Sequence, residues 1–335
     1  MSSVAQVAIH HSQFPANVRN DLLASLRARR VNHKFHYDSV KQTQKWLALH
    51  EAYSPARTDA NCAATYDAGF AAAVGRIAAP VVRVIGLGCG GGQKDARLLQ
   101  LLLDSGKQVA YTPSDVSMAM VLVARAAALA IVAEGDCHPL VCDLATAEDL
   151  ALVLDQQPKA GMARLITFFG MIPNFEPQLI LPRLAALVRP DDHLLFSANL
   201  APGADYEAGV RQVLPLYNNA LTRDWLMTFL LDLGVAREDG EMFFNIETVA
   251  ADGLKRITAD FEFHRNCELQ VEGERFTYAH GDKMRLFFSY RHTTDRVRSM
   301  LAQYQLSVSD EWITGSEEEG VFLCKREANS VSEHV

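Results

Sequence analysis

The sequence predicts an α/β protein with a doubly wound parallel sheet, a second, smaller α+β domain and a helical N-terminal cap. Three observations predict this fold class. Short, continuously apolar runs alternate with helical segments between residues 81 and 200. A glycine-rich turn at residues 86–92 follows the first run, and the alternation stops after residue 201. Apolar strands that alternate with helices are typical of a parallel sheet covered on both faces.

The elements follow from periodicity, taken in order along the chain. Apolar positions at three- and four-residue spacing predict N-terminal helices at residues 20–30, 38–53 and 60–78. The alternating region predicts strands at 81–87, 108–115, 138–144, 163–171 and 192–200. The helices between them are predicted at 95–106, 118–135, 147–157 and 177–188. Residues 204–250 are predicted as helical, and later strands at 256–265, 267–273, 275–280, 285–291, 306–314 and 320–326.

These elements predict how the chain divides into domains. We expect the last two strands to form a hairpin that returns to the main sheet. The predicted division is an N-terminal helical cap that belongs to the substrate domain (1–80), a cofactor-binding domain (81–202), an inserted substrate domain (203–292) and C-terminal strands that complete the main sheet (293–328).

Composition limits the function. The chain has 335 residues, 49% of them hydrophobic, and a formal net charge of -8, which predicts a globular protein with a small-molecule substrate and without nucleic acid. Six scattered cysteines show no metal-ligand spacing and predict reduced thiols and no metal site. We see no signal peptide and no apolar run long enough to span a membrane, so a cytoplasmic, non-membrane protein is expected. The oligomeric state is left open.

The ends of three successive strands carry the residues expected to bind a cofactor. Gly88 and Gly90 lie in the glycine-rich turn, which lets backbone approach a nucleotide. Asp115 ends the next strand, where a carboxylate can accept hydrogen bonds from a ribose diol. Asp143 and Leu144 end the third strand, where they can contact an adenine amino group and ring. Each acid also suits a helix N-cap. The glycine turn, Asp115 and Asp143 together, at the ends of three successive strands, nevertheless favour a binding site for S-adenosyl-L-methionine (SAM).

The whole chain, from about residue 15 to 325, resembles the histidine-specific SAM-dependent methyltransferases, a family with a Rossmann-like class I methyltransferase domain and a substrate domain. The resemblance rests on FHYDSVKQTQKW with AYSPARTD, LGCGGGQK, YTPSDVS, FFGMIPNFEP and LYNNAL. It places Tyr37 and Tyr53 on the two tyrosines of the family and Lys94 on the lysine after its glycine loop. It also places Asn174 and Tyr217 on the pair that holds the α-amino and carboxylate groups of the substrate.

The sequence departs from the family at two places. The late motif Thr-Glu-x-Ser-x-Lys-Phe, whose Glu and Ser hydrogen-bond the substrate imidazole, aligns with LFFSYRH. Ser289 is retained, but Phe287 stands at the glutamate position, and a lost charge-assisted hydrogen bond costs about 1.5–3 kcal/mol. Histidine is therefore not expected as the substrate. The acid that usually precedes the first loop glycine is also missing, since Gly86 stands there.

Two reactions fit a SAM site that faces an amino-acid clamp. The favoured hypothesis is cyclisation of SAM by its own α-amine, which gives azetidine-2-carboxylate and methylthioadenosine. Phe169, Asn174 and Tyr217 resemble the corresponding residues of azetidine-2-carboxylate synthases of this fold, enzymes of secondary metabolism. The alternative is methyl transfer to the α-amine of a small or apolar amino acid. Aromatic side chains such as Tyr53 can stabilise the sulfonium in either reaction. A non-catalytic SAM-binding protein is the third hypothesis.

Two further groups of charged residues have no assigned function. Arg285 and Arg291 fit either a substrate carboxylate or the solvent face of a strand. The acidic segment GSEEEG, residues 315–320, is interpreted as a solvated turn between the last two strands.

Overall fold

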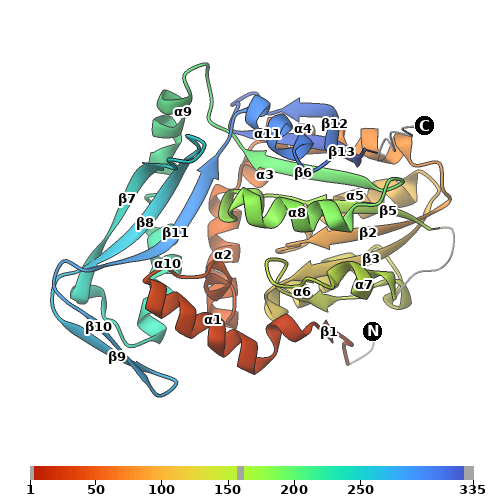
Figure 1. The fold of residues 1–335 in the computed structure, drawn as a ribbon. Coiled ribbons are helices and arrows are strands. Elements are labelled where there is room, and N and C mark those ends of the chain that lie inside the picture. Colours follow the sequence, from red (N-terminus) through yellow and green to blue (C-terminus); the bar gives the residue numbers. More distant parts are fainter. Residues whose placement is uncertain (1–3, 157–161, 328–335) are drawn as a thin grey trace, which may run out of the picture.

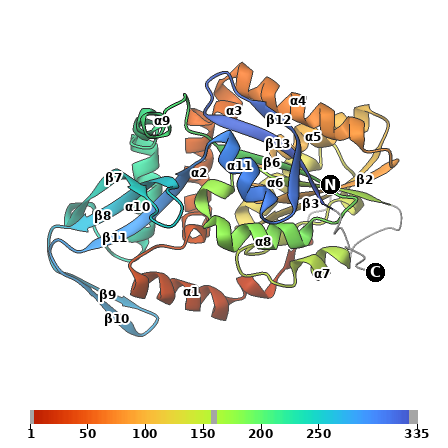
Figure 2. The ribbon, with the colours of Figure 1, turned by 45° about the horizontal axis from the view of Figure 1, so that its top comes forward.

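The computed structural model describes residues 4–156 and 162–327. Its centre is a sheet of eight strands (Figures 1 and 2), and β2 to β6 run parallel, with β13 antiparallel to both of its neighbours. The order across the sheet is β1 (Ala8–Ile9), β4 (Leu140–Val141), β3 (Gln108–Asp115), β2 (Val81–Leu87), β5 (Ala163–Phe168), β6 (His193–Asn199), β13 (Glu319–Arg326) and β12 (Leu306–Ile313). The predicted α/β fold class is confirmed.

Helices cover both faces of this sheet. One face packs against α4 (Ala60–Arg76), α5 (Gln93–Asp104) and α6 (Met118–Ala128). The other packs against α7 (Leu150–Asp155), α8 (Pro177–Leu187) and α11 (Thr294–Ala302). The strands between them are buried along nearly their whole length, as continuous apolar runs require. None of the helices in the described residues is long and apolar enough to cross a membrane.

A second unit lies beside the carboxyl ends of the parallel strands, at the left of Figure 1. Its antiparallel sheet has the order β11 (Lys283–Arg291), β8 (Lys255–Phe263) and β7 (Gly240–Thr248). The hairpin of β9 (Cys267–Val271) and β10 (Glu274–Tyr278) and the helices α1 (Pro15–Ala28), α2 (Val40–Tyr53), α9 (Tyr206–Val213) and α10 (Ala220–Asp232) complete it. Leu23 and Leu26 of α1 share its core with Trp225 and Leu226 of α10.

The N-terminal segment is divided between the two units, which differs from its expected place in the substrate domain alone. α1 and α2 pack in the second unit, after which α3 (Pro55–Thr58) leads to α4. α4 packs on the main sheet, because its apolar residues, including Tyr66 and Phe70, face β13 and α5. β1, which the sequence did not predict, adds to the main sheet beside β4.

Several predicted elements need correction. Residues 240–248 form strand β7 and not helix, because their backbone pairs with β8 along the whole length of that strand. The helix predicted at 118–135 ends at Ala128, although Val132 remains buried in the same core. α11 was not predicted. Gln157, at the end of a predicted helix, lies outside the described residues, as do residues 1–3 and 328 of the predicted domains.

Candidate active site

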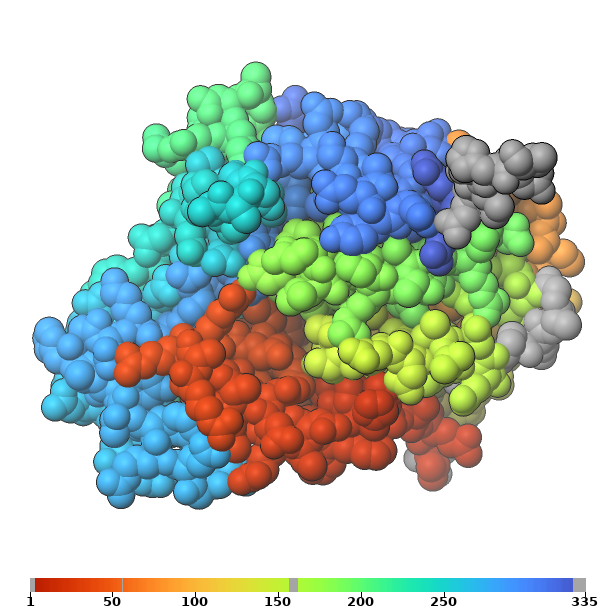
Figure 3. All heavy atoms as spheres, viewed as in Figure 1, coloured from red at the N-terminus to blue at the C-terminus, as the bar shows by residue number. Residues whose placement is uncertain are grey.

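A cavity of about 1610 Å³ lies between the two units, at the carboxyl ends of the parallel strands. Its lining includes all but one of the site residues predicted from the sequence, Ser289 being the exception. Figure 3 shows the outside of this region, where the red N-terminal segment meets the yellow-green segment of the main unit. The predicted residues therefore gather at one place, where open α/β sheets bind their ligands.

The glycine turn forms one wall of the cavity. Gly88 and Gly90 have φ values of +64° and +51°, a region that residues with a Cβ adopt only under strain. A Cβ on Gly88 would overlap the side chain of Met171, and a Cβ on Gly90 would lie 3.1 Å from the Trp46 ring. The chain is thus folded so that bare backbone faces the cavity, as close approach of a nucleotide requires.

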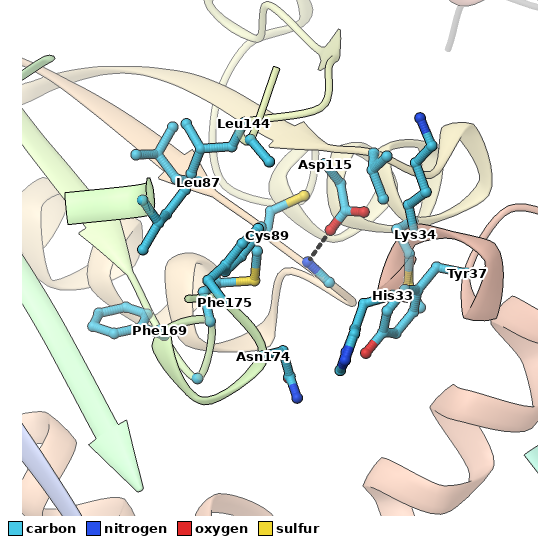
Figure 4. A pocket seen from close by; sticks show the side chains of 18 of the residues that line it. His33, Lys34, Tyr37, Leu87, Cys89, Asp115, Leu144, Phe169, Asn174 and Phe175 are labelled. Atoms are coloured by element: carbon cyan, nitrogen blue, oxygen red, sulfur yellow. Dashed lines mark hydrogen bonds between the residues drawn. The ribbon is translucent and has the colours of Figure 1, made fainter. Parts of the chain in front are cut away.

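Asp115 lies next to this turn, at the end of β3 (Figure 4). Its Oδ2 accepts a hydrogen bond from the backbone N–H of Gly90 at 3.1 Å, and Oδ1 accepts one from Ser117 N–H at 3.0 Å. Burial raises its pKa to about 6 although these N–H donors oppose the rise. Tyr37 is close enough for the charge of Asp115 to add to the rise in the pKa of the phenol, which burial mainly causes.

Asp143 and Leu144 also line the cavity, but Asp143 already has a partner in the described chain. Lys34, which is buried in the short 3-10 helix His33–His36, places its Nζ 3.3 Å from Asp143 Oδ2 and also pairs with Asp21. Oδ1 of Asp143 accepts a hydrogen bond from Ala145 N–H at 2.9 Å. Its carboxylate thus ties the N-terminal segment to the third parallel strand, in addition to any contact with a ligand.

Lys94 points into a buried polar cluster at the far side of the turn. Its Nζ donates to the Tyr66 hydroxyl at 2.6 Å and lies 3.4 Å from Glu319. Tyr66 in turn donates to Glu319 and bonds Ser197 at 2.9 Å. Although burial opposes it, Lys94 and these hydrogen bonds hold the pKa of Glu319 below its usual value. Glu319 belongs to GSEEEG, so the interpretation of that segment as a solvated turn is wrong at its last acid, which is 8% exposed.

The other half of the cavity, called the substrate half from here on, is lined by Tyr217, Phe287 and Arg291 of the second unit and by Asn174, which lies between β5 and α8 of the main unit. The Tyr217 hydroxyl lies 2.9 Å from the Ser289 hydroxyl and accepts a hydrogen bond from Arg291 Nη2 at 2.9 Å. Asn174 donates from Nδ2 to the Phe288 carbonyl at 2.8 Å, and Figure 4 shows its amide at the edge of the open space. The structure thus brings Asn174 and Tyr217 to one end of the cavity, and Ser289, which does not line the cavity, is bonded to Tyr217.

Phe287 and its surroundings leave little place for a substrate imidazole. Phe287 is buried between Tyr217 and Trp225, with ring centroids 6.2 and 5.8 Å away. The ring of His33 lies 5.0 Å from Phe287, and burial lowers the pKa of His33 well below its usual value, so that it is neutral. Both positions that the resemblance assigns to imidazole recognition are therefore engaged by neighbouring side chains, because Ser289 is bonded to Tyr217.

Three predicted residues lie away from this end. Tyr53, at the end of α2, lines the cavity but is 52% exposed, which places it at the mouth. Phe169 lies beside Lys94 and Tyr66, with its ring centroid 5.8 Å from Lys94 Nζ. Tyr37 packs between Trp46 and Trp225 and lies closer to the nucleotide half.

The structure also reveals cavity residues that the sequence analysis missed or left open. Arg291 is 6% exposed and lines the cavity, whereas Arg285 pairs with Glu247 and Asp260. Asp95, in the first turn of α5, is a buried acid of the cavity lining. The feature of the sequence that could have identified it is Gly86 in strand β2, followed by an acid at the start of the next helix.

Three side chains outside the cavity also come together unexpectedly. Asp149 brings a carboxylate to His10 and His11, which the sequence spacing did not indicate. His10 Nε2 lies 2.7 Å from Asp149, and its Nδ1 accepts a hydrogen bond from Ser12 N–H. The cluster thus fastens the segment after β1 to the residue that precedes α7.

The nucleotide half of the cavity fits SAM. Three features are positioned for a nucleoside that carries no phosphate. They are the bare backbone at Gly88, the apolar side chain of Leu144, and the carboxylate of Asp115, which forms no ion pair within the described residues. Asp115 is the residue that can accept hydrogen bonds from ribose hydroxyls, since both of its present donors are backbone N–H groups and further lone pairs remain.

Comparisons with known proteins agree with this fit. The sequence matches the family described as "Histidine-specific methyltransferase, SAM-dependent" over residues 18–326. No curated protein matches. Similar solved structures include magnesium protoporphyrin IX methyltransferase (ChlM) from Synechocystis PCC 6803 with bound SAH (14% identity, 94% of this chain and 100% of that chain covered, TM-score 0.42).

Two further solved structures are similar over most of their length. They are 1,6-didemethyltoxoflavin-N1-methyltransferase from Burkholderia thailandensis (12% identity, 85% and 87% covered, TM-score 0.41) and a possible exported protein from Bordetella parapertussis (10% identity, 94% and 99% covered, TM-score 0.48). The match to the family extends over most of the chain, and the strand order and the glycine turn are consistent with it. The chain belongs to the histidine-specific, SAM-dependent methyltransferase family.

Proposed function

We propose that the protein transfers a methyl group from SAM to the α-amine of a small amino acid other than histidine, and that it binds the carboxylate of that amino acid at Arg291. The size of the cavity supports a second substrate. Pockets that enclose one drug-sized ligand hold roughly 300–1,000 Å³, and this cavity is about 1610 Å³. It extends beyond the nucleotide half to Phe287 and Arg291 of the second unit.

Arg291 is the observation that carries the proposal. Its guanidinium donates to the carbonyls of Leu200 and Glu318 and to the Tyr217 hydroxyl, which are all uncharged acceptors. Its Nε is buried without a hydrogen-bond partner, and Arg291 forms no ion pair within the described residues. A buried charge without a counter-charge is costly, and a carboxylate is the usual partner of a guanidinium. An anionic ligand group would therefore stabilise this end of the cavity.

The neighbouring side chains suit an amino acid held in this way. Asn174 uses its Nδ2 on the Phe288 carbonyl, so its Oδ1 is left to accept a hydrogen bond from an amine. Tyr217, held by Ser289 and Arg291, can orient the carboxylate. Phe287 and Trp225 form an apolar wall that favours a neutral amine over an ammonium ion.

The reaction then needs little from the protein besides placement. SAM supplies a methyl carbon on a sulfonium, and its C–S bond breaks as the C–N bond forms. The amine loses its proton to solvent before it enters, and the side chains hold its lone pair in line with the methyl group, where placement alone contributes much of the rate. Lys94 is bound by Tyr66 and Glu319 and so is not free to act as a base.

Cyclisation of SAM by its own α-amine, the reaction favoured by the sequence, remains the second candidate. Phe287 supports it, because cyclisation uses no second substrate and therefore needs no side chain that binds an imidazole at this position. Under this reaction Asn174 and Tyr217 would bind the aminocarboxypropyl chain of SAM itself. The two reactions release different products, since cyclisation gives methylthioadenosine and methyl transfer gives S-adenosylhomocysteine.

The experiment incubates the purified protein with SAM alone and then with each of the twenty amino acids or its carboxamide. We expect no methylthioadenosine from SAM alone, and S-adenosylhomocysteine with at least one amino acid but not with its carboxamide. Release of methylthioadenosine without an acceptor would support cyclisation and overturn methyl transfer. Equal turnover of acid and amide would refute the carboxylate contact. Arg291→Met should raise KM for the acid at least ten-fold, and Arg285→Met, outside the cavity, should leave it unchanged.

A further inference from the structure

Gly86 and Asp95 occupy complementary positions beneath the glycine turn. Gly86 lies near the end of β2, and Asp95 lies one turn into the following helix, α5. A Cβ built on Gly86 would overlap Asp95 Oδ2 and would lie 3.2 Å from the Tyr111 hydroxyl. The backbone of Gly86 is ordinary strand, so its conformation does not require glycine. The glycine is needed for space, and the carboxylate of Asp95 fills that space.

Asp95 is held as an acceptor. The Tyr111 hydroxyl donates to Oδ2 at 2.7 Å, and the Thr167 hydroxyl donates to Oδ1 at 2.8 Å. Each oxygen thus keeps a lone pair, and the residue lines the cavity together with Thr167 and Gly88. Burial raises the pKa of Asp95, whereas the two hydroxyl donors and Lys94 lower it.

The charge of Asp95 is not neutralised by a neighbouring cation. Asp95 is 3% exposed and forms no ion pair within residues 4–156 and 162–327. Lys94, the adjacent residue, directs its Nζ to Tyr66 and Glu319. A buried carboxylate with hydroxyl donors alone lacks the partner that usually offsets the cost of desolvation. A cationic group of a ligand in the cavity would supply it.

We propose that Asp95 binds the ammonium group of SAM, and that Gly86 admits this carboxylate from the helix. The acid expected in the strand at position 86 is thereby supplied from position 95, nine residues later. The inference concerns SAM alone and does not depend on which acceptor the protein methylates.

The test measures dissociation constants by calorimetry for two probes: S-adenosylhomocysteine and its deaminated analogue, which carries the carboxylate but no amine. Asp95→Asn should raise the dissociation constant of S-adenosylhomocysteine at least ten-fold and change that of the analogue by less than two-fold. Asp104→Asn, an exposed acid on the same helix, is the matched control and should change neither. An equal loss for both probes, or no loss for either, would overturn the proposal.

A second pair of variants tests the exchange of position. Gly86→Asp should lower the affinity for S-adenosylhomocysteine, because the new side chain overlaps Asp95. Gly86→Asp combined with Asp95→Gly should recover this affinity to within ten-fold of that of the wild type. A double variant that folds, as judged by its circular dichroism, yet binds no better than Gly86→Asp would contradict the exchange. If Asp95→Asn does not fold, the affinities of the wild-type protein for the two probes provide the test. Equal affinity for S-adenosylhomocysteine and for its deaminated analogue would exclude a contact with the ammonium group and overturn the proposal.

Discussion

Binding of SAM should depend on pH through Asp115. Burial raises the pKa of this carboxyl to about 6, and its ionised form is the one that can accept hydrogen bonds from two ribose hydroxyls, the contact that we predict for SAM. A bound ribose therefore favours the ionised form and lowers the pKa in the complex. Because the free protein takes up a proton as the pH falls through 6 and the complex does not, affinity is nearly full at pH 7 and above and decreases progressively as the pH falls through about 6.

The magnitude follows from the pKa. One unit below the pKa of about 6, at pH 5, about one-tenth of the free protein has Asp115 ionised. If only this form binds, the dissociation constant rises roughly ten-fold between pH 7 and pH 5. Protonation of Asp95, whose pKa burial also raises, acts in the same direction.

The assay is calorimetric titration of S-adenosylhomocysteine at pH 5, 6, 7 and 8. We expect a plateau above about pH 7 and a fall below it. Asp115→Asn should bind S-adenosylhomocysteine more weakly than the wild type at pH 7, and its affinity should change less with pH. An affinity of the wild-type protein that does not change between pH 7 and pH 5 would refute the reasoning. A variant Asp115→Asn that keeps the full pH dependence would assign the effect to another group.

Two further predictions concern the rest of the cavity. Tyr66→Phe removes hydrogen bonds to Lys94, Glu319 and Ser197 and should lower the free energy of unfolding by about 1.5–3 kcal/mol in urea denaturation. Tyr304→Phe, whose hydroxyl has no hydrogen bond within the described residues, should lower it by less than about 0.5 kcal/mol, and equal losses would contradict the assignment. Phe287→Glu restores the acid of the family motif and should produce detectable methylation of histidine, measured as S-adenosylhomocysteine, where the wild-type protein gives none. A folded variant that is inert toward histidine would count against the alignment of this motif.

The parallel half of the fold was predictable because local sequence determines it. β2 and β3 have the bounds predicted for them, since Gly88 follows β2 and Asp115 ends β3, which marks where each strand stops. β7 was not predictable from periodicity, because the three consecutive apolar residues 242–244 interrupt the alternation of its sequence, and the strand is defined by pairing with β8. The helix at 118–135 was predicted too long because Val132 is apolar for packing and not for helix formation.

Most of the residues predicted from the sequence line the cavity, but the charged groups that surround them could not be predicted. Glycines and acids at strand ends identify the nucleotide half because topology alone brings strand ends together. The state of Arg291, Glu319 and Asp95 depends on which neighbours reach them across the fold. Glu319 is a surface acid by composition and becomes buried only because Tyr66 and Lys94, more than 220 positions earlier, meet it.

The sharing of cores between distant segments has a consequence for how this protein is made. Val31 hydrogen-bonds Arg285 across 254 positions, and α2 packs on α10, which leaves the ribosome much later. α2 therefore lacks its partner α10 for most of synthesis, and β13, which follows β12 in the sequence, takes its place between β6 and β12. Because contacts of such long sequence separation form slowly, folding is completed after most of the chain has been synthesised, and the nascent N-terminal helices are the part that a chaperone would need to protect.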